Sequence, residues 1–391
     1  MTVVNRLPEP AGILLDRSRT ISFTFDGRSY TGFAGDTVAS AVVSSGQRVL
    51  SRSFKYHRPR GVLTMAGHDA NTLVELEDES SILADRLPIS EGLHISAQNY
   101  WGSLKNDRGM ILDRFSKFLP VGFYYKTFFR PNWSFKYWEK LIRAMAGIGK
   151  VNLNARHEYY DKAYGFCDVA IVGAGPAGLA AALAAGDAGA EVILIDENPI
   201  LGGSLNYARF DTSGEKAGEV RSELVGKVEN HAQITIYTDA VCQACFAENW
   251  LPVTKGNRLY KIRAQELVVC TGSLEQHLIF RNNDLPGIMM GGAAQRLIRL
   301  YGVRPGDRAV VTATTDDGYA VALDLLDAGV QVAAIVDLRK SPPASEMQNA
   351  VRGRDIPVLA GSTITEAVPG PGKRSIRAVN VAEITTEGEV S

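Results

Sequence analysis

The sequence predicts an α/β chain in which a small α+β domain precedes a Rossmann-type nucleotide-binding region. Residues 21–46 are typical of a β-hairpin followed by a short helix. Residues 166–197 are typical of a strand, a glycine-rich turn, a helix and a second strand, and residues 308–338 repeat that pattern in a degenerate form. Together the three segments indicate a β-grasp domain followed by a dinucleotide-binding fold with a nested second βαβ unit.

The expected domain boundaries follow from these patterns. We expect the β-grasp domain over residues 1–105, an aromatic-rich connector over 106–165 and the Rossmann-type region over 166–391. The second nucleotide-like unit is expected over about 303–391.

Composition argues against nucleic-acid and membrane partners. The 391 residues include 42 Lys and Arg and 43 Asp and Glu, so a net charge of −1 provides no field that attracts nucleic acid. No run of about 18 apolar residues can cross a bilayer, and the first residues lack the apolar core of a signal peptide. Four cysteines in so long a chain form no disulfide scaffold, so we expect a reducing, cytoplasmic location.

The N-terminal segment predicts the β-grasp domain. ISFTFDGRSYTGF (21–33) alternates apolar and polar residues around Asp26-Gly27, a dipeptide suited to a tight hairpin turn. GDTVASAVVSSG (35–46) predicts a short helix, and NTLVELE (71–77) predicts a further strand.

Residues 117–150 are rich in aromatic side chains. Lysines and arginines are interleaved with them, which excludes a membrane-spanning helix. Two interpretations remain open: a connector whose aromatics pack against both neighbouring domains, or a surface that binds another protein chain of a complex. The aromatic residues are Phe118, Phe123, Tyr124, Tyr125, Phe128, Phe129, Trp133, Phe135, Tyr137 and Trp138.

The strongest motif is Gly173-Ala174-Gly175-x-x-Gly178, which follows a strand and opens a helix. Gly173 permits a tight turn, Gly175 lets the backbone approach a pyrophosphate, and Gly178 lets the helix pack close to the strand. Pro176 lies in the first helical turn, where its missing N–H costs nothing. We expect the phosphates on the free amides at this helix N-terminus.

Residues after the motif support the same site. Asp196 closes the second strand, where a carboxylate meets ribose hydroxyls, and Gly203 belongs to a second glycine pair that closes over the pyrophosphate. A later strand is expected to turn sharply at Thr271-Gly272 beside the nucleotide. Val241 follows a strand that runs alongside the second one, and its backbone is expected to read the adenine edge. The alternative, a glycine turn without a ligand, stays open.

The repeat at 308–338 lacks these glycines. Aligned on the first unit, Thr312, Thr314 and Asp317 stand where the three glycines stood. β-branched threonines obstruct a close backbone approach. Asp316 and Asp317 are expected to cap the helix with their own side chains and to repel a phosphate. We therefore expect this unit to keep the fold and to bind no pyrophosphate.

Cysteine and histidine patterns indicate no metal site and no identifiable catalytic residue. Cys242-Gln-Ala-Cys245 has redox spacing, but it follows a strand instead of opening a helix, so no dipole lowers a thiol pKa. No second Cys/His pair is spaced to complete a zinc site. We expect a structural role for both thiols.

The stretch SRSFKYHRPRG (51–61) is a local basic cluster with two interpretations. Its cations either face an anionic group, such as a flavin phosphate or a partner subunit, or they make only structural hydrogen bonds. They are Arg52, Lys55, His57, Arg58 and Arg60.

Several phrases together resemble the α subunit of heterotetrameric sarcosine oxidase. They are FTFDGRSYTGFAGDTVASAV, SRSFKYHRPRG, GFYYKTFFRP, GAGPAG with IDENPILGG, and TGSLEQHLIFRNNDLPGIM. These phrases span most of the chain and are more specific than the glycine motif. Related α subunits of opine, proline-type and cyanide-forming dehydrogenase complexes share parts of the pattern.

The resemblance implies a division of labour. The family's α subunit holds NAD on its glycine-fingerprint domain, a β partner carries FAD and oxidises the amine, and FMN lies at the α/β boundary. Small accessory subunits complete the hetero-oligomer, and the amine substrate is reached through the partner. Glu197 beside Asp196 disfavours a 2′-phosphate through like charge, so NAD is favoured over NADP. By carry-over the NAD site is lined by Ala177, Asp196, Glu197, Asn198, Ser204 and Val241.

Two departures from the family pattern matter. The N-terminal fold resembles the ferredoxin domain that binds a [2Fe–2S] cluster, yet no cysteine precedes Cys167, so we expect no iron–sulfur cluster in residues 1–166. The family also continues into the rest of the nucleotide fold and a folate-binding domain. We therefore expect a Rossmann-type region that is incomplete at its C-terminus, or completed on another chain.

Three functional hypotheses follow. The first is an NAD-binding subunit of a complex that oxidatively demethylates sarcosine or a related N-methyl amino acid. The second is the corresponding subunit of another amine, opine or proline-type dehydrogenase that uses a quinone or dye as acceptor. The third is a non-catalytic nucleotide-binding scaffold for the catalytic partner.

Overall fold

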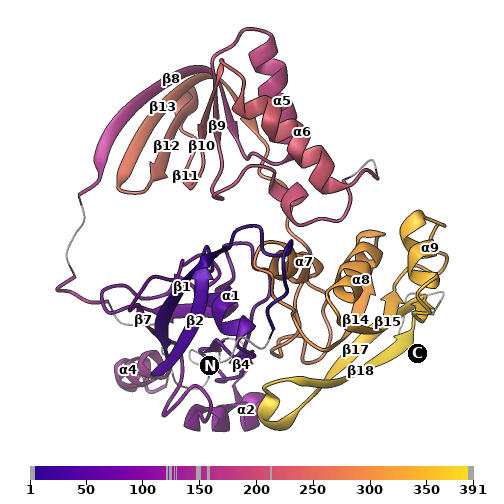
Figure 1. The fold of residues 1–391 in the computed structure, drawn as a ribbon. Helices are drawn as coiled ribbons and strands as arrows, with labels where there is room; N and C mark the ends of the chain where they lie inside the picture. Colours follow the sequence, from indigo (N-terminus) through magenta and orange to yellow (C-terminus); the bar gives the residue numbers. More distant parts are fainter. Residues whose placement is uncertain are drawn as a thin grey trace. The chain divides into compact units, whose positions relative to one another are not determined.

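The computed structural model of the chain describes residues 5–119, 122, 126, 128, 130–146, 151–155, 159–211 and 214–385. The chain forms two compact units (Figure 1). The large unit consists of Met1–Ala155 and His277–Ser391, and the small unit consists of Arg156–Gln276. The predicted fold class is confirmed, because a β-grasp domain and Rossmann-type βαβ units are both present. The predicted domain boundaries remain a prediction.

The large unit begins with the β-grasp domain. Its elements are β1 (Asp16–Phe25), β2 (Arg28–Ala34), α1 (Val38–Ser44), β3 (Ser51–Arg52), β4 (Pro59–Arg60), β5 (Leu73–Glu75), β6 (Ile82–Leu83) and β7 (His94–Ala97). The sheet has the order β2-β1-β7-β5-β6, in which β1 pairs antiparallel with β2 and parallel with β7. Both Asp26 and Gly27 have positive φ, so the predicted tight hairpin turn is confirmed.

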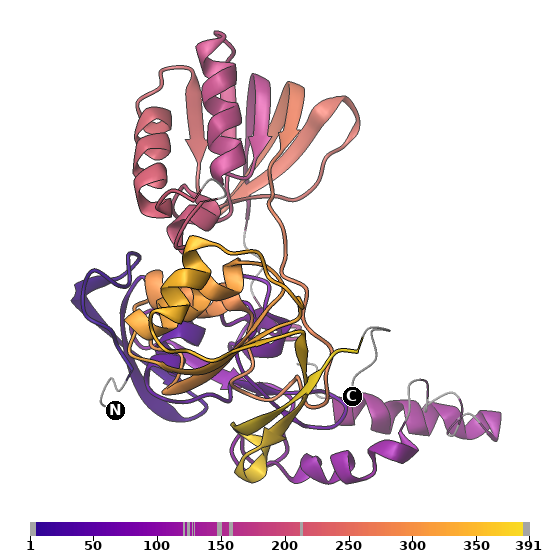
Figure 2. The same cartoon turned by 90° about the vertical axis from the view of Figure 1, so that its right-hand side faces the viewer.

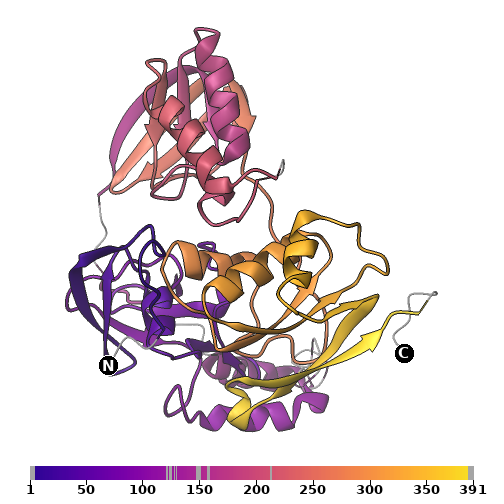
Figure 3. The same cartoon turned by 45° about the vertical axis from the view of Figure 1, so that its right-hand side comes forward.

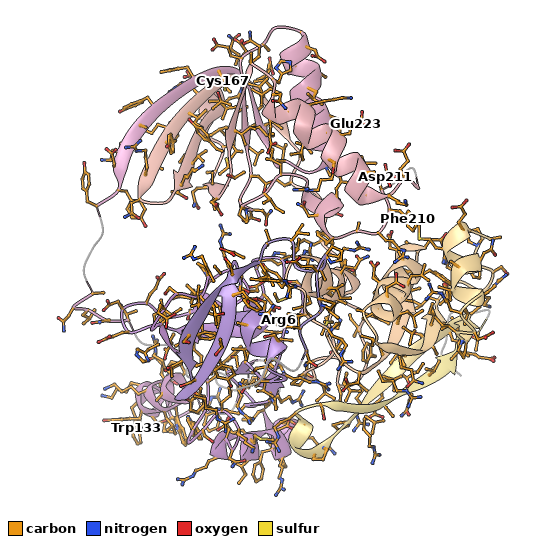
Figure 4. All side chains as sticks on the ribbon, in the orientation of Figure 1. Arg6, Trp133, Cys167, Phe210, Asp211 and Glu223 are labelled. Carbon is orange, nitrogen blue, oxygen red and sulfur yellow. The ribbon has the colours of Figure 1, made fainter. Side chains whose placement is uncertain are left out.

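Helix α1 is buried along its whole length. Thr37 caps its first turn: the Thr37 hydroxyl accepts the amide of Ser40, and the Ser40 hydroxyl accepts the amide of Thr37. Arg6, labelled in Figure 4, forms an ion pair with the buried Asp36 carboxylate just before this helix. The short helix therefore depends on its cap and on burial in the core, because seven residues are too few to be stable alone.

The rest of the large unit contains the degenerate βαβ, which is made of β14, α8 and β15. The elements here are α2 (Ile111–Arg114), α4 (Phe135–Ala146), α7 (Gly291–Arg299), β14 (Arg308–Ala313), α8 (Asp317–Asp327), β15 (Gln331–Asp337), α9 (Glu346–Arg352), β16 (Val358–Ala360), β17 (Ser362–Pro369) and β18 (Ile376–Glu383). β14, β15 and β16 form a parallel sheet, and Figure 3 shows α8 and α9 on one face of it. Ala293 and Leu297 of α7 enter the β-grasp core, which joins the two parts of this unit.

The small unit contains the fingerprint βαβ, which is made of β8, α5 and β9. Its elements are β8 (Asp161–Val172), α5 (Pro176–Asp187), β9 (Val192–Ile195), α6 (Ala217–Glu229), β10 (Ile234–Tyr237), β11 (Ala240–Cys242), β12 (Trp250–Lys255) and β13 (Arg258–Val269). The sheet has the order β10-β9-β8-β13-β12-β11, and its first four strands are parallel. Figure 2 shows α5 and α6 side by side on one face. Strand β8 begins inside the predicted connector, because its first residues pair with β13.

Strand β9 is buried on both faces of the sheet of the small unit. Val192 and Leu194 pack on the side of α5 and α6, whereas Ile193 and Ile195 pack on the opposite side. Successive side chains of a strand point to opposite faces, so four consecutive apolar residues indicate two covered faces. Cys167 of β8, labelled in Figure 4, belongs to the opposite side, and burial raises its pKa to about 11.

The predicted aromatic connector exposes much of its apolar surface within the described residues. Phe118, Trp133 and Tyr137 are 75 %, 71 % and 60 % exposed. Phe128 and Trp138 contact each other, with ring centroids 4.6 Å apart. Phe123, Tyr124, Tyr125 and Phe129 lie outside the described residues. The exposed rings favour the interpretation of a surface that binds another protein chain over that of a buried connector.

Across the residues with described structure, no helix combines the length and apolar character needed to span a bilayer.

Candidate dinucleotide-binding site

The glycine turn at the end of β8 is built by close backbone approaches. Gly173 has a φ of +101°, and a Cβ at this position would lie 2.2 Å from the carbonyl oxygen of Cys270. A Cβ at Gly178 would lie 1.8 Å from the carbonyl oxygen of Gly173. Both distances are far below van der Waals contact, so only glycine allows α5 to start this close to β8 and β13.

The second glycine pair lies against the first turn. The Gly202 amide donates to the Ala174 carbonyl at 2.9 Å, and a Cβ at Gly203 would lie 2.7 Å from Cα of Gly175. At Gly175 the surroundings are open, because among the described residues an added Cβ would find only the Gly203 Cα, at 3.9 Å. The two loops therefore touch and leave room at Gly175, which begins α5 as its N-cap.

Asp196 is buried, and its carboxylate ties the turn to the segment after β9. One carboxylate oxygen accepts the Ala174 amide at 2.6 Å, and the other accepts the amide and the side-chain nitrogen of Asn198 at 2.8 and 2.9 Å. Glu197 and Asn198 themselves are exposed. Asp196 thus holds the turn in shape, and its predicted contact with ribose hydroxyls remains a prediction.

The remaining predicted residues lie at the same edge of the sheet. The Gly173 amide donates to Ile195, and the Cys270 amide donates to Val172, so the chain reaches Thr271-Gly272 directly beside the turn. Both of these residues are exposed. Carboxyl ends of parallel strands meet at one edge, which is where ligands bind in open α/β sheets.

Val241 and the residues at the start of α5 complete the predicted set. The Ala240 amide donates to the Asp196 carbonyl at 2.9 Å, which brings the half-buried Val241 next to the segment after β9. Pro176 and Ala177 are exposed in the first turn of α5, and Ser204 is exposed in the 3-10 turn after the second glycine pair. The structure thus gathers residues from four segments of the sequence at one edge of the small unit.

Two residues that hold this edge carry no sequence signal. Asn206 is buried, and its side-chain oxygen accepts a hydrogen bond from Nε of Arg221 on α6. This contact fixes the second glycine loop against a helix that lies later in the chain. Sequence reasoning missed it because neither residue type nor their spacing is part of a motif.

The degenerate βαβ differs from its predicted alignment. Asp316 is the N-cap of α8, as Gly175 is the N-cap of α5. Asp316 has helical φ and ψ, however, so the strand register sets the alignment: Thr312 pairs with Val336 just before Asp337, as Val172 pairs with Ile195 just before Asp196. The alignment is therefore shifted by one residue, and Ala313, Thr315 and Gly318 take the places of the three glycines. The predicted capping by aspartate side chains was wrong, because the Asp316 N-cap makes no side-chain cap hydrogen bond.

Instead of capping α8, the Asp316 carboxylate binds the side chain of Arg339. Its guanidinium nitrogen Nη2 contacts Asp316 at 3.0 Å and the fully buried Asp337 at 2.8 Å. Tyr319 donates its hydroxyl to Asp337 at 2.8 Å, and burial together with this carboxylate raises the pKa of Tyr319 to about 12. The Arg339 side chain therefore occupies the space between the start of α8 and the end of β15.

The basic cluster at 51–61 is largely engaged inside the large unit. Arg52 is buried and donates to the carbonyl oxygens of His57 and Leu104. Arg58 pairs with Asp113 at 2.6 Å, and Arg60 pairs with Asp284 at 2.8 Å. His57 is buried against Asp107, and Lys55 lies over the ring of Tyr56. These contacts support the structural interpretation of the cluster.

The two cysteines with redox spacing are free thiols in the structure. Cys242 is half-buried in β11, and burial raises its pKa. Cys245 is exposed after the strand. A raised pKa disfavours the reactive thiolate at Cys242, which supports a structural role.

Comparison with known families identifies the class of protein. Residues 167–387 match the family model described as pyridine nucleotide-disulphide oxidoreductase, and residues 18–100 match the 2Fe-2S iron-sulfur cluster binding domain. The chain belongs to the pyridine nucleotide-disulphide oxidoreductase family. Its segment 18–100 contains no cysteine, so the expected absence of a cluster stays a prediction that iron analysis can test.

The curated relatives confirm the resemblance to sarcosine oxidase α subunits. The chain is 39 % identical to the alpha subunit of sarcosine oxidase from Rhizobium meliloti (strain 1021) over 85 % of its own length and 36 % of that protein. It is 30 % identical to the corresponding opine oxidase chain of Agrobacterium tumefaciens (strain Ach5) over 45 % of this chain and 38 % of the relative. The chain thus spans about a third of the length of the curated relatives it matches.

A solved structure shows the same fold. The L-proline dehydrogenase from P. horikoshii is similar over 98 % of this chain and 60 % of that one, with a TM-score of 0.62 and 18 % identity. At this identity the likeness concerns the fold alone.

Proposed function

We propose that the chain is the NAD-binding α subunit of a sarcosine-oxidase-type flavoenzyme complex, which oxidatively demethylates sarcosine or a related N-methyl amino acid. One observation carries the proposal. The glycine turn of the fingerprint βαβ brings β8 and α5 into backbone contact and leaves open space at Gly175. The similarity to the Rhizobium meliloti protein over most of this chain supports the type of complex.

The site fits a dinucleotide by its shape. The amides in the first turn of α5 have no partner within the helix, and a pyrophosphate placed over Gly175 would accept from them. Glu197 and Asp196 are adjacent acids, which disfavours the 2′-phosphate of NADP and favours NAD. When bound, NAD supplies a nicotinamide ring that can accept a hydride.

The chain's own contribution is binding and orientation. Asp196 holds the turn through the Ala174 amide, and Gly203 covers the turn from the other side. We assign no catalytic acid or base to this chain. Amine oxidation belongs in this proposal to FAD on a β subunit, with FMN shared at the boundary and accessory subunits completing a cytoplasmic complex.

A second candidate is the corresponding subunit of an opine oxidase. The similarity to the opine oxidase chain of Agrobacterium tumefaciens over 45 % of this chain favours it. Substrate choice separates the two candidates. With its partner subunits, the chain is expected to support oxygen consumption with sarcosine, whereas turnover with an opine but not with sarcosine would favour the second candidate.

A variant of the turn tests the nucleotide part of the proposal. Gly175→Val places methyl groups in the open space, so NAD released from the purified complex is expected to fall to background in mass spectrometry. Gly226→Val is the matched control, because no atom of the described residues lies within 4 Å of a Cβ added there on α6. Unchanged NAD content in Gly175→Val would contradict the proposed site. Loss of NAD with unchanged turnover would instead support a scaffold role.

A further inference from the structure

A cationic pocket lies in the large unit, where the chain after Leu104 meets the tip of the β17–β18 hairpin. The pocket has a volume of about 340 Å³. Lys105 and Arg108 line it from one segment, and Gly372 and Arg374 line it from the other. Small-molecule sites in proteins have volumes of roughly 300–1,000 Å³, so the pocket is large enough for a small ligand.

Three cations of this pocket lack a carboxylate partner among the described residues. Lys105 and Arg108 are exposed, and Arg374 is half-buried. The neighbouring cations differ in this respect, since Lys373 and Arg58 both pair with Asp113. Within the described part of the chain, the charge of the three pocket cations is therefore uncompensated.

The single acid of the pocket is turned inward and already satisfied. Asp107 accepts the amides of Trp101 and Gly109 at 2.8 Å each and contacts Nδ1 of His57 at 2.7 Å. Arg52 lies 3.6 Å from the same carboxylate. Burial alone would raise the pKa of Asp107, but these hydrogen bonds hold it below its usual value. Asp107 therefore anchors the loop that follows Leu104, and the buried guanidinium of Arg52 compensates its charge.

The shape of the pocket is held by contacts outside it. The ion pair between Lys373 and Asp113 fastens the hairpin tip to α2, and Figures 1 and 3 both show this tip beside that helix. The buried network of Arg52, His57 and Asp107 fixes the other wall. The three cations therefore project from two fixed segments, as a ligand site requires.

We propose that this pocket binds a phosphate group, with Arg108 and Arg374 as bidentate donors and Lys105 as a third positive charge. The planar guanidinium matches phosphate oxygens with two parallel N–H donors, and lysine adds a point charge. The volume leaves space beyond the phosphate for an organic substituent. This site is independent of the glycine turn, so the ligand is additional to the NAD of the proposed function.

Hydrogen–deuterium exchange on the full chain tests the proposal at the site itself. Inorganic phosphate and ribose 5-phosphate are the two probes, and amides in 104–110 and 372–376 are expected to become protected. Tighter binding of the sugar phosphate identifies an organic phosphate as the ligand, and equal binding identifies free phosphate. Peptides that cover 173–178 are read separately, so failure of the nucleotide site is distinguishable from failure here.

The double variant Arg108→Gln, Arg374→Gln is expected to weaken phosphate binding at least about tenfold, because two charge-assisted donors are lost. Arg377→Gln is the matched control, since Arg377 is exposed on β18 and does not line the pocket. Unchanged exchange elsewhere in the large unit shows that the double variant is folded. No protection of the wild type at millimolar probe, or equal protection in the double variant, would overturn the proposal.

Discussion

The fingerprint βαβ and the degenerate βαβ use the same aspartate turn after their second strand. Asp196 accepts the amide of Asn198 at 2.8 Å, and Asp337 accepts the amide of Arg339 at 2.9 Å. The short asparagine folds back onto its own aspartate, whereas the long arginine reaches the start of the helix. The same βαβ scaffold can therefore leave its helix N-terminus open or fill it with one of its own side chains. The outcome depends on the side chains at the two ends of the turn.

The largest expected effect concerns the close backbone approach at the open turn of the fingerprint βαβ. Gly178→Ala places a Cβ 1.8 Å from a backbone oxygen, so we expect the small unit to lose more than about 4 kcal/mol of unfolding free energy. Gly226→Ala on α6 is the control and is expected to cost nothing measurable. Denaturant unfolding of both variants measures this, and equal stability of the two would contradict the account.

Removing Arg339 is expected to have the next largest effect. Arg339→Leu leaves the buried Asp337 and the half-buried Asp316 without their cation, which we expect to destabilise the large unit by about 2–4 kcal/mol. Adding Asp337→Asn should recover part of this loss, because the unpaired charge is removed. Thermal unfolding of the single and double variants checks the sign, and a double variant less stable than Arg339→Leu would contradict it.

The ion pairs of Arg339 with Asp316 and Asp337 predict that the stability of the large unit depends on pH in the acidic range. Burial by itself would raise the pKa values of Asp316 and Asp337, but contacts that include hydrogen bonds from Arg339 lower both. A lowered folded pKa means that the stabilisation is complete above the unfolded value of about 3.9 and is lost as pH falls through the folded values. Melting temperature should therefore fall below about pH 4, and it should fall less in Arg339→Leu. Parallel curves for the two proteins would argue against the cluster.

Asp196→Asn is expected to have a smaller effect. Asparagine keeps one acceptor for the Ala174 amide but loses the charge, so the small unit should lose about 1–2 kcal/mol. NAD affinity should fall as the turn loosens. Equilibrium unfolding together with NAD titration measures both, and an increase in either quantity would contradict the positioning role.

The smallest effect is expected at Cys245. Cys245→Ser changes an exposed thiol, so stability should stay within about 0.5 kcal/mol and activity should be unchanged. Thiol titration with a turnover assay tests this, and lost turnover would reveal a redox role.

The sequence predicted those features that one local motif determines. Asp26-Gly27 specified the hairpin turn, and the fingerprint glycines specified a turn that no other residue can adopt. Strand β8 was predicted too short because the first half of the strand is mostly exposed and shows no buried pattern. Steric limits restrict the residues of the two turns strongly and make them predictable. Burial does not restrict the exposed first half of β8, so that half was missed.

The degenerate βαβ was harder to predict, because its turn is closed by a contact between Arg339 and Asp316, which lie far apart in the sequence. Only the third fingerprint glycine has a counterpart, Gly318, so the alignment had a weak anchor and was wrong by one residue. Arg339 carried no signal, since its partner Asp316 lies on the far side of α8 and β15 in the sequence. The same holds for Asn206 with Arg221 and for the pocket between the hairpin tip and Arg108.

The number of dinucleotides released per chain shows directly whether the fingerprint βαβ holds NAD. Purified complex, denatured and measured by quantitative mass spectrometry, should release one NAD for each copy of this chain. Gly175→Val should release none, and Arg339→Leu should still release one, because the fingerprint βαβ alone holds the nucleotide. NAD that persists in Gly175→Val, or disappears in a folded Arg339→Leu, would contradict the account.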